Sequence, residues 1–315
     1  MKPAFCLLLL FLCAAACAQK LEKYFDYLWK PCAPENARYY TAIQKKDSLW
    51  TRVDYYIREK YSQMTGSYLD EENKIPHGKF AYYHPNKQLE GTGEYRNGKR
   101  EGLWLWFHEN GMMSDSSHFK NGRLVGTTLR WYFDGMIQDS LVMNEDGSGV
   151  QVSWFQNGHP SSAGWYSAGE KLNGKWKFYH NNGQLSAVEV YDKGKLLNRE
   201  YFDKNGQAES DTTNKDREAK PESAEKWKKY LESTAYFPSQ WKITGANQAV
   251  VIVRFAVDEE GKVVEPMVTY SFHPDFDKIV YDAIKKSPRW QLAISHNRAI
   301  KTYHTQPITF SQQEQ

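Results

Sequence analysis

The chain has 315 residues, of which 40% are hydrophobic, 15% are aromatic and 25% are charged, with a formal net charge of +3. The modest hydrophobic fraction excludes a polytopic membrane protein, and the high aromatic content excludes a mainly disordered chain. So small a net charge excludes a dedicated nucleic-acid binder, and we expect no nucleic-acid partner. Trp and Tyr at this density favour half-buried β surfaces, where one side of a ring packs and its polar tip stays hydrated.

The first 18 residues predict a secretory signal peptide. Lys2 supplies a short basic start, residues 4–13 form an apolar run, and Ala16-Cys17-Ala18 offers small residues for cleavage. The run is shorter than the roughly 20 residues of a spanning helix, so we expect no spanning helix in the mature chain. The alternative is lipidation: Cys17 follows small residues, and its acylation would make the protein an outer-membrane lipoprotein instead of a free periplasmic protein.

Removal of the signal peptide leaves Cys32 as the single cysteine, which cannot form an internal disulfide. We therefore expect hydrophobic packing to hold the fold, and Cys32 to be a small, partly buried residue rather than a reactive thiol. Residues 19–48 form an N-terminal segment before a repeat domain, which we place at 49–206.

The repeat domain has a period of about 24 residues, as is typical of repeat architectures. Glycine marks this period in two series. They are Gly78, Gly102, Gly126, Gly149 and Gly174, and Gly111, Gly135, Gly158, Gly183 and Gly206. Asn-Gly pairs such as Asn97-Gly98 and Asn110-Gly111 predict type I′ hairpin turns, because both central residues of that turn need positive φ. Two turns per repeat predict a long antiparallel β-meander whose alternating strands place the rings on one face.

Two segments of the array, 102–111 (GLWLWFHENG) and 174–183 (GKWKFYHNNG), resemble MORN-repeat variants. Segments such as 95–99 (YRNGK) are similar to the second half of that repeat. The resemblance implies a scaffold or a binding surface, and some bacterial members of the family are labelled antitoxins. We expect the rings to be the packed face of a sheet.

Residues 207–226 contain no aromatic or large aliphatic residue and mix acids with bases, which predicts a solvated charged linker. Residues 227–315 then predict a small α+β domain of ββαβ order, so that the fold class is mainly β. Pro274 pre-sets the first turn of its helix, an apolar stripe follows, and Pro288 ends it. The expected strands are 249–257, 263–271 and 299–310.

The order of motifs in this domain resembles the TonB C-terminal domain. The motifs are Val251–Val263 for V-x-V-x-F-x-V-D-x-x-G-x-V, His273–Asp277 for H-P-x-[LF]-D, Pro288–Trp290 for P-x-W and Pro307–Phe310 for P-I-x-F. Asn297-Arg298-Ala299 departs from the Asn-Gly-Lys of the family, so the loop into the last strand is altered. TonB energy transducers also have an uncleaved anchor and a long proline-rich spacer. We find neither pattern, and expect no transmission of proton-motive force by this chain by itself.

The TonB resemblance implies an edge strand that pairs with an extended peptide by β-strand addition. The candidate strand is 299–306, with Lys301, Tyr303 and Thr305 on one face as candidate partner-binding residues. The expected partner is a protein or extended peptide, such as an outer-membrane receptor. The alternative is that this edge closes a homodimer or is shielded.

No pattern in the sequence predicts catalysis. The nine His residues are scattered, and H-E-x-x-H, G-x-S-x-G and EF-hand patterns are missing. We therefore expect no enzyme activity, no catalytic residue, no cofactor and no metal site. The hypothesis is an exported, periplasmic protein-binding module of a Gram-negative envelope, with the repeat sheet as a second interaction surface. The alternatives are an accessory of TonB-dependent transport across the outer membrane and a structural spacer without a specific ligand.

Overall fold

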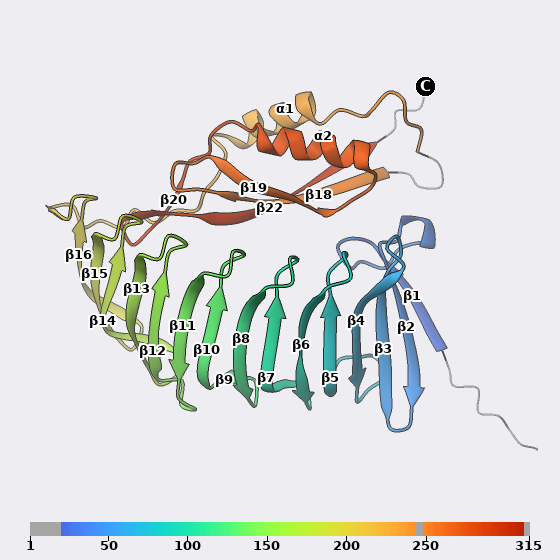
Figure 1. Cartoon of the computed structure of the whole chain (residues 1–315), viewed down its shortest axis with the longest axis horizontal. Helices are drawn as coiled ribbons and strands as arrows, with labels where there is room; N and C mark the ends of the chain where they lie inside the picture. The colour runs from blue at the N-terminus through green and yellow to red at the C-terminus, as the bar shows by residue number, and fades with distance from the viewer. Residues whose placement is uncertain (1–19, 244–247, 312–315) are drawn as a thin grey trace, which may run out of the picture.

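The computed structural model describes residues 20–243 and 248–311. The predicted signal peptide and Cys17 lie outside these residues. The chain is mainly β, with a long antiparallel meander followed by a small α+β unit, as the sequence predicts. In Figure 1 the meander is a row of upright strands, and the C-terminal unit lies along the upper ends of these strands.

The meander contains strands β1 to β17, most of which pair antiparallel with the next strand in the chain. The exception is the two-residue β9, which pairs with β8, while β8 also pairs with β10. The segment before the predicted array contributes β1 and β2 to the same sheet. The elements are β1 (Lys20–Phe25), η1 (Pro34–Asn36), β2 (Tyr39–Lys46), β3 (Leu49–Tyr56), β4 (Tyr61–Tyr68), β5 (Gly78–Tyr83), β6 (Leu89–Arg96), β7 (Lys99–Phe107), β8 (Met113–Lys120), β9 (Arg123–Leu124), β10 (Gly126–Trp131), β11 (Ile137–Met143), β12 (Gly149–Trp154), β13 (Pro160–Ser167), β14 (Lys171–Tyr179), β15 (Leu185–Asp192), β16 (Lys195–Phe202) and β17 (Ala208–Glu209).

Two kinds of tight turn are common between these strands. At the end away from the C-terminal unit, Asn97-Gly98 and Asn121-Gly122 have positive φ at both residues, which confirms the expected type I′ turns there. The same expectation is wrong for Asn110-Gly111, where only the glycine has positive φ. A longer loop, closed by hydrogen bonds from His108 N–H to Met112 O and from Gly111 N–H to His108 O, leaves a single left-handed residue, as in a bulged hairpin. Other loops of this kind contain Asp134-Gly135, Asp146-Gly147, Asn157-Gly158, Asn182-Gly183 and Asn205-Gly206.

Buried rings on one face of the sheet pack against glycines of the neighbouring strand. Trp104 and Trp176 occupy the same repeat position, and both are buried. A Cβ at Gly93 would stand 2.1 Å from the Trp104 ring, and a Cβ at Gly164 would stand 2.0 Å from the Trp176 ring. Each indole N–H donates to a backbone carbonyl at 3.1 and 2.9 Å respectively. The rings therefore form the packed face of a sheet, and the paired glycine makes room for each of these two.

This packing predicts that Gly164→Ala lowers the free energy of unfolding by about 2–3 kcal/mol, because a rigid indole cannot yield to an added methyl group. The backbone of Gly164 lies outside the positive-φ region, so the loss reports the ring contact rather than backbone strain. Urea unfolding measures it. Lys177→Ala, an exposed change on β14, is the control and is expected to cost less than about 0.5 kcal/mol. An equal loss in both variants would contradict the packing argument.

The C-terminal unit packs two helices on one face of a three-stranded sheet of order β19-β18-β22. Phe276, Val280 and Ile284 of α2 are buried against the sheet. Helix α1 was not expected, because it lies in a charged segment. Its only large apolar or aromatic residues are Trp227, Tyr230 and Leu231. The elements are α1 (Ala224–Thr234), β18 (Gln248–Val257), β19 (Val263–Tyr270), α2 (Pro274–Lys285), β20 (Ala293–Ser295), β21 (Arg298–Ile300) and β22 (Thr302–Ser311). The expected last strand is thus divided at Lys301.

The prediction of a solvated linker is wrong for its middle part. Arg217 and Ile294 exchange backbone hydrogen bonds at 2.9 and 2.8 Å, and Lys220 and Gln291 do so at 3.1 and 2.8 Å. Ala219 is buried in the core of the C-terminal unit. An extended segment pairs through its backbone and needs only one small apolar side chain, so composition did not reveal this docking.

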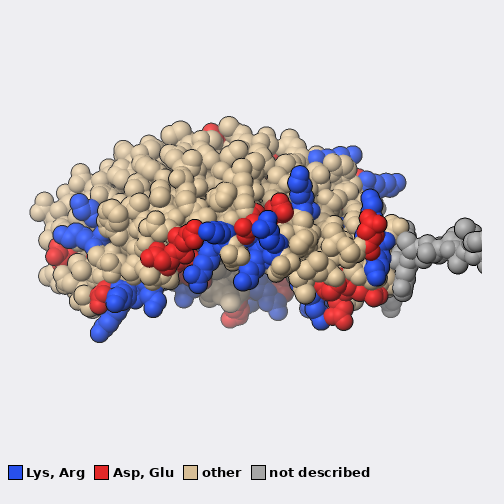
Figure 2. All heavy atoms as spheres, turned by 90° about the horizontal axis from the view of Figure 1, so that it is seen from below, with Lys and Arg blue, Asp and Glu red and all other residues tan. Residues whose placement is uncertain are grey.

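The turns at the far end of the meander carry charges of both signs. Figure 2 shows this side, with Lys and Arg interleaved with Asp and Glu beside a broad area without charged side chains. Exposed ion pairs such as Lys120–Glu145, at 2.5 Å, contribute little to stability. Neither α-helix of the described part of the chain has the length and apolar content of a bilayer-spanning helix.

Candidate protein-binding site

Strand β22 is an edge strand of the C-terminal sheet. It pairs with β18 from Thr302 to Ser311 without a register shift, and no strand of the described residues pairs with its other side. An open edge offers backbone N–H and C=O groups to another extended chain.

The register shows which residues of β22 direct backbone groups outward. Pro307 is opposite Ile252, whose carbonyl accepts a hydrogen bond from Thr269 Oγ1 of β19 at 3.3 Å and so points away from β22. Ile252 and Pro307 therefore form a non-hydrogen-bonded pair, a position that suits proline because it has no N–H to donate. By alternation, the odd-numbered residues from Tyr303 to Thr309 direct their backbone groups to the open edge.

Pro307 limits this edge. It offers no N–H, and its carbonyl accepts a hydrogen bond from Gln306 Nε2 at 2.9 Å. Trp227 of α1 in turn donates to Gln306 Oε1 at 3.0 Å, which holds that side chain in place. Before Pro307, the residues of β22 whose backbone N–H groups point outward are therefore Tyr303 and Thr305.

The candidate residues Lys301, Tyr303 and Thr305 lie along this part of the chain. Lys301 forms an ion pair with Glu265 at 2.5 Å, and the Tyr303 hydroxyl donates to the same carboxylate at 3.4 Å. Burial acts to lower the pKa of Lys301, but the hydrogen bond to Glu265 and the electrostatic attraction of Tyr303, Glu265 and Glu259 together outweigh it and raise that pKa. Lys301 and Tyr303 thus share one charged partner, whereas Thr305 is exposed farther along the strand.

A ladder of side-chain hydrogen bonds joins the loops that face the C-terminal unit. At each step, one side chain donates to the carbonyl that directly precedes the equivalent residue of the next repeat. His84 Nε2 donates to Phe107 O at 2.9 Å, for example, and Phe107 directly precedes His108. The other steps run from His108 to Trp131 O (3.0 Å), Tyr56 to Tyr83 O (3.1 Å), Tyr132 to Trp154 O (2.9 Å) and His180 to Phe202 O (2.9 Å).

The ladder corrects the expectation that the His residues are scattered. His84, His108 and His180 are separated by one and three repeat periods and occupy one position of the repeat. A carbonyl only accepts, so each Nε2 must carry a proton and donate. The repeat register was the signal that would have identified these three residues as structural.

The tip of the β20–β21 hairpin contacts the meander at this loop edge. The His296 ring stacks on Phe178 with centroids 3.5 Å apart, and its Nδ1 lies 2.9 Å from Glu189 Oε2. Burial acts to raise the pKa of Glu189, but hydrogen bonds from His296 and Tyr191, together with electrostatic attraction to His296 and Arg199, outweigh it and hold that pKa below its usual value. The loop that departs from the TonB pattern is therefore part of the contact between the two units.

A second contact joins the C-terminal unit to the other end of the meander. Arg58 Nη1 donates to the carbonyls of residues 271 and 272 at 2.6 and 2.9 Å. The buried Arg38 guanidinium lies 4.8 Å from the ring centroids of both Tyr56 and Tyr270. Cation–π contacts of this kind are strongest when they are shielded from water. The C-terminal unit is thus held at both ends above the loop edge.

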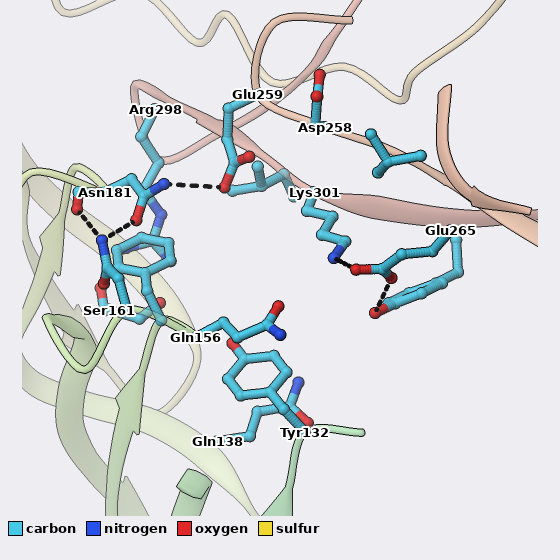
Figure 3. A pocket seen from close by; sticks show the side chains of 15 residues that line it. Tyr132, Gln138, Gln156, Ser161, Asn181, Asp258, Glu259, Glu265, Arg298 and Lys301 are labelled. Carbon is cyan, nitrogen blue, oxygen red and sulfur yellow. Dashed lines mark hydrogen bonds and ion pairs between the residues drawn. The ribbon is translucent and has the colours of Figure 1, made fainter. Parts of the chain in front are cut away.

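Two adjoining cavities of about 620 and 470 Å³ lie between these contacts. Figure 3 shows Tyr132, Gln138 and Gln156 on the meander side, with Lys301 and Glu265 on the side of the C-terminal unit. Lys301 and Tyr303 line the larger cavity, and Thr305 does not. The structure therefore brings two of the three candidate residues to this groove.

The described residues show no grouping typical of a metal site or a reactive thiol. Within residues 20–243 and 248–311, no three His, Cys, Asp or Glu side chains are grouped to hold a metal ion. Cys32 is a free, partly buried cysteine, as expected, and burial raises the pKa of its thiol. A raised pKa disfavours the nucleophilic thiolate.

Comparison with known families identifies both parts of the chain. Residues 235–311 match the Gram-negative bacterial TonB protein C-terminal family, and residues 76–97, 100–121 and 172–193 match the MORN repeat variant. The chain contains MORN-variant repeats and a TonB C-terminal domain. The three matched repeats coincide with the hairpins β5–β6, β7–β8 and β14–β15, so each repeat is one hairpin. No curated protein matches the chain.

Both families are non-catalytic binding modules, and the TonB C-terminal domain implies a protein partner in the Gram-negative cell envelope. The TonB C-terminal domain therefore suggests a role in protein interaction. The edge of β22 and the groove beside it are the features of the structure that suit such a role.

Proposed function

We propose that the protein is an exported, non-enzymatic binding module of the envelope that takes up an extended segment of an outer-membrane protein as an added strand beside β22. The observation that carries this proposal is the open edge at Tyr303 and Thr305, where backbone groups point outward. Main-chain hydrogen bonds supply affinity in this mode of recognition, and neighbouring side chains supply selectivity. Lys301 and Tyr303 are the selectivity residues, because both line the groove next to the edge.

The proposal predicts that Thr305→Pro weakens partner binding by about tenfold, because it removes one outward N–H and places a ring at the edge. Thr305→Ala keeps the N–H and is expected to bind within about twofold of the native chain. Titration of the purified partner against both full-length variants measures the difference. Equal affinities for the two variants would show that strand addition is not the binding mode.

The partner itself is identified by photo-crosslinking in Gram-negative cells, with a photoreactive residue in place of Thr305 of the full chain. We expect a product with an outer-membrane protein, and none of that product from a probe at Lys228, whose side chain is 77% exposed on α1. A product between two copies of this chain would support the homodimer instead. If a receptor is captured, loss of siderophore or vitamin uptake on deletion of the gene identifies an accessory of transport.

A further inference from the structure

One step of the hydrogen-bond ladder is missing. The ladder position after Tyr132 is Phe155, whose phenyl ring has no hydrogen to donate. The carbonyl that a donor at this position would reach is that of Tyr179, which directly precedes the next ladder residue, His180. The steps from Tyr132 and from His180 are both intact. The repeat array therefore has a single vacant acceptor between two filled steps.

Arg298 of the TonB C-terminal domain supplies the missing donor. Its Nη1 donates to Tyr179 O at 2.9 Å and also to Ser161 O. Its guanidinium carbon lies 5.3 Å from the Phe155 centroid and 5.5 Å from the Phe178 centroid. The residue that breaks the ladder thus also provides a ring face for the cation that replaces it.

The missing ladder step at Phe155, called the gap below, also explains how the buried Arg298 is stabilised. Arg298 is 8% exposed and forms no ion pair with a carboxylate of the described residues. Burial lowers its pKa to about 10 and costs free energy, which hydrogen bonds and ring contacts must offset. The gap offers two carbonyls and two rings. At every intact step, a His or Tyr side chain already donates to the equivalent carbonyl.

We propose that the gap at Phe155 is the recognition site that determines where the C-terminal domain docks on the repeats. Successive repeats present nearly equivalent loops, so a docking hairpin needs one loop that differs from the others. The gap provides that difference, and the partner that fits it is a β-hairpin carrying a guanidinium group, here residues 295–298. At an intact ladder step, the His or Tyr donor would compete with the guanidinium group for the carbonyl.

A double-mutant cycle on the full chain tests this proposal, with amide hydrogen exchange of residues 156–161 and 295–299 as the measure of docking. Arg298→Ala is expected to speed exchange in both segments by about tenfold. Phe155→His is expected to speed exchange of residues 295–299 similarly, because the imidazole competes with Arg298 for the Tyr179 carbonyl. The control Phe133→His changes an exposed ring in the neighbouring repeat loop and is expected to change neither segment.

The two changes are expected to interact when combined. In the Arg298→Ala background, Phe155→His completes the ladder. The exchange rate of residues 156–161 is therefore expected to fall again, and the exchange rate of residues 295–299 is expected to show no further increase. Unchanged protection of α2 shows that each variant is folded. Independent, multiplicative effects of the two changes, or full protection of residues 295–299 in Phe155→His, would overturn the proposal.

Discussion

Trp104→Ala is expected to lower the free energy of unfolding by about 4 kcal/mol, the largest effect of any single change considered for the repeats. The indole is 0% exposed and lies on Gly93, with the Tyr95 and Trp106 rings at 4.9 and 5.8 Å between centroids. Because the sheet is the only strand layer here, no second layer of strands refills the space left by the ring, and the Gly93 backbone loses its cover. Urea unfolding of the full chain measures the loss.

The matched control for Trp104→Ala is Leu103→Ala, one residue earlier on β7. Leu103 is 54% exposed and points to the opposite face, so the control is expected to cost less than about 1 kcal/mol. Two similar losses would show that the ring face is not the core of the meander.

Glu189→Ala is expected to cost about 3 kcal/mol and to release the hairpin tip from the meander. The carboxylate is 1% exposed, and it accepts hydrogen bonds from His296 and Tyr191 that no other acceptor replaces. The control is Glu200→Ala, an exposed change on β16 that is expected to have little effect. Unfolding in urea, with hydrogen exchange of residues 295–299, separates the loss of stability from the loss of docking.

The lowered pKa of Glu189 also predicts that the stability of the protein depends on pH. Its pKa in the folded chain is held below 4.5, so its contribution to stability is fully present above 4.5 and disappears as the pH falls through the lowered value. The native chain is therefore expected to lose more stability on acidification below 4.5 than Glu189→Gln, which does not titrate. Parallel stability curves for the two chains would contradict this assignment.

Local chemistry explains which parts of the fold were predictable. The type I′ turns at Asn97-Gly98 and Asn121-Gly122 depend on two adjacent residues, and the repeat period depends on glycines at fixed spacing. The bulged loops also contain Asn-Gly pairs, but their asparagines serve a different purpose. Asn110 accepts from the Met112 N–H and donates to the Phe133 carbonyl, one repeat farther along. The same dipeptide therefore forms two turn types, and a contact between repeats distinguishes them.

The candidate binding strand was predictable only in part. The TonB motifs place the last strand from Thr302 onward, because Ile308 and Phe310 of P-I-x-F pack on the core. Which residues offer their backbone outward depends on the pairing of Pro307 with Ile252, a contact between residues 55 positions apart. The groove beside Lys301 and Tyr303 depends on loops from a different domain.

The sequence by itself determined the mainly β fold class, the repeat period of the meander and the ββαβ order of the C-terminal unit, because turn chemistry and alternating hydrophobicity act over a few residues. Only the tertiary structure decided how the units are joined. The carbonyl of Tyr179, the Phe155 ring and the Arg298 guanidinium come from three segments that are separated in the sequence, and no short-range pattern connects them. Their role depends on folding, which brings the Tyr179 carbonyl and the Arg298 guanidinium together. Each group then reduces the free-energy cost of burying the other.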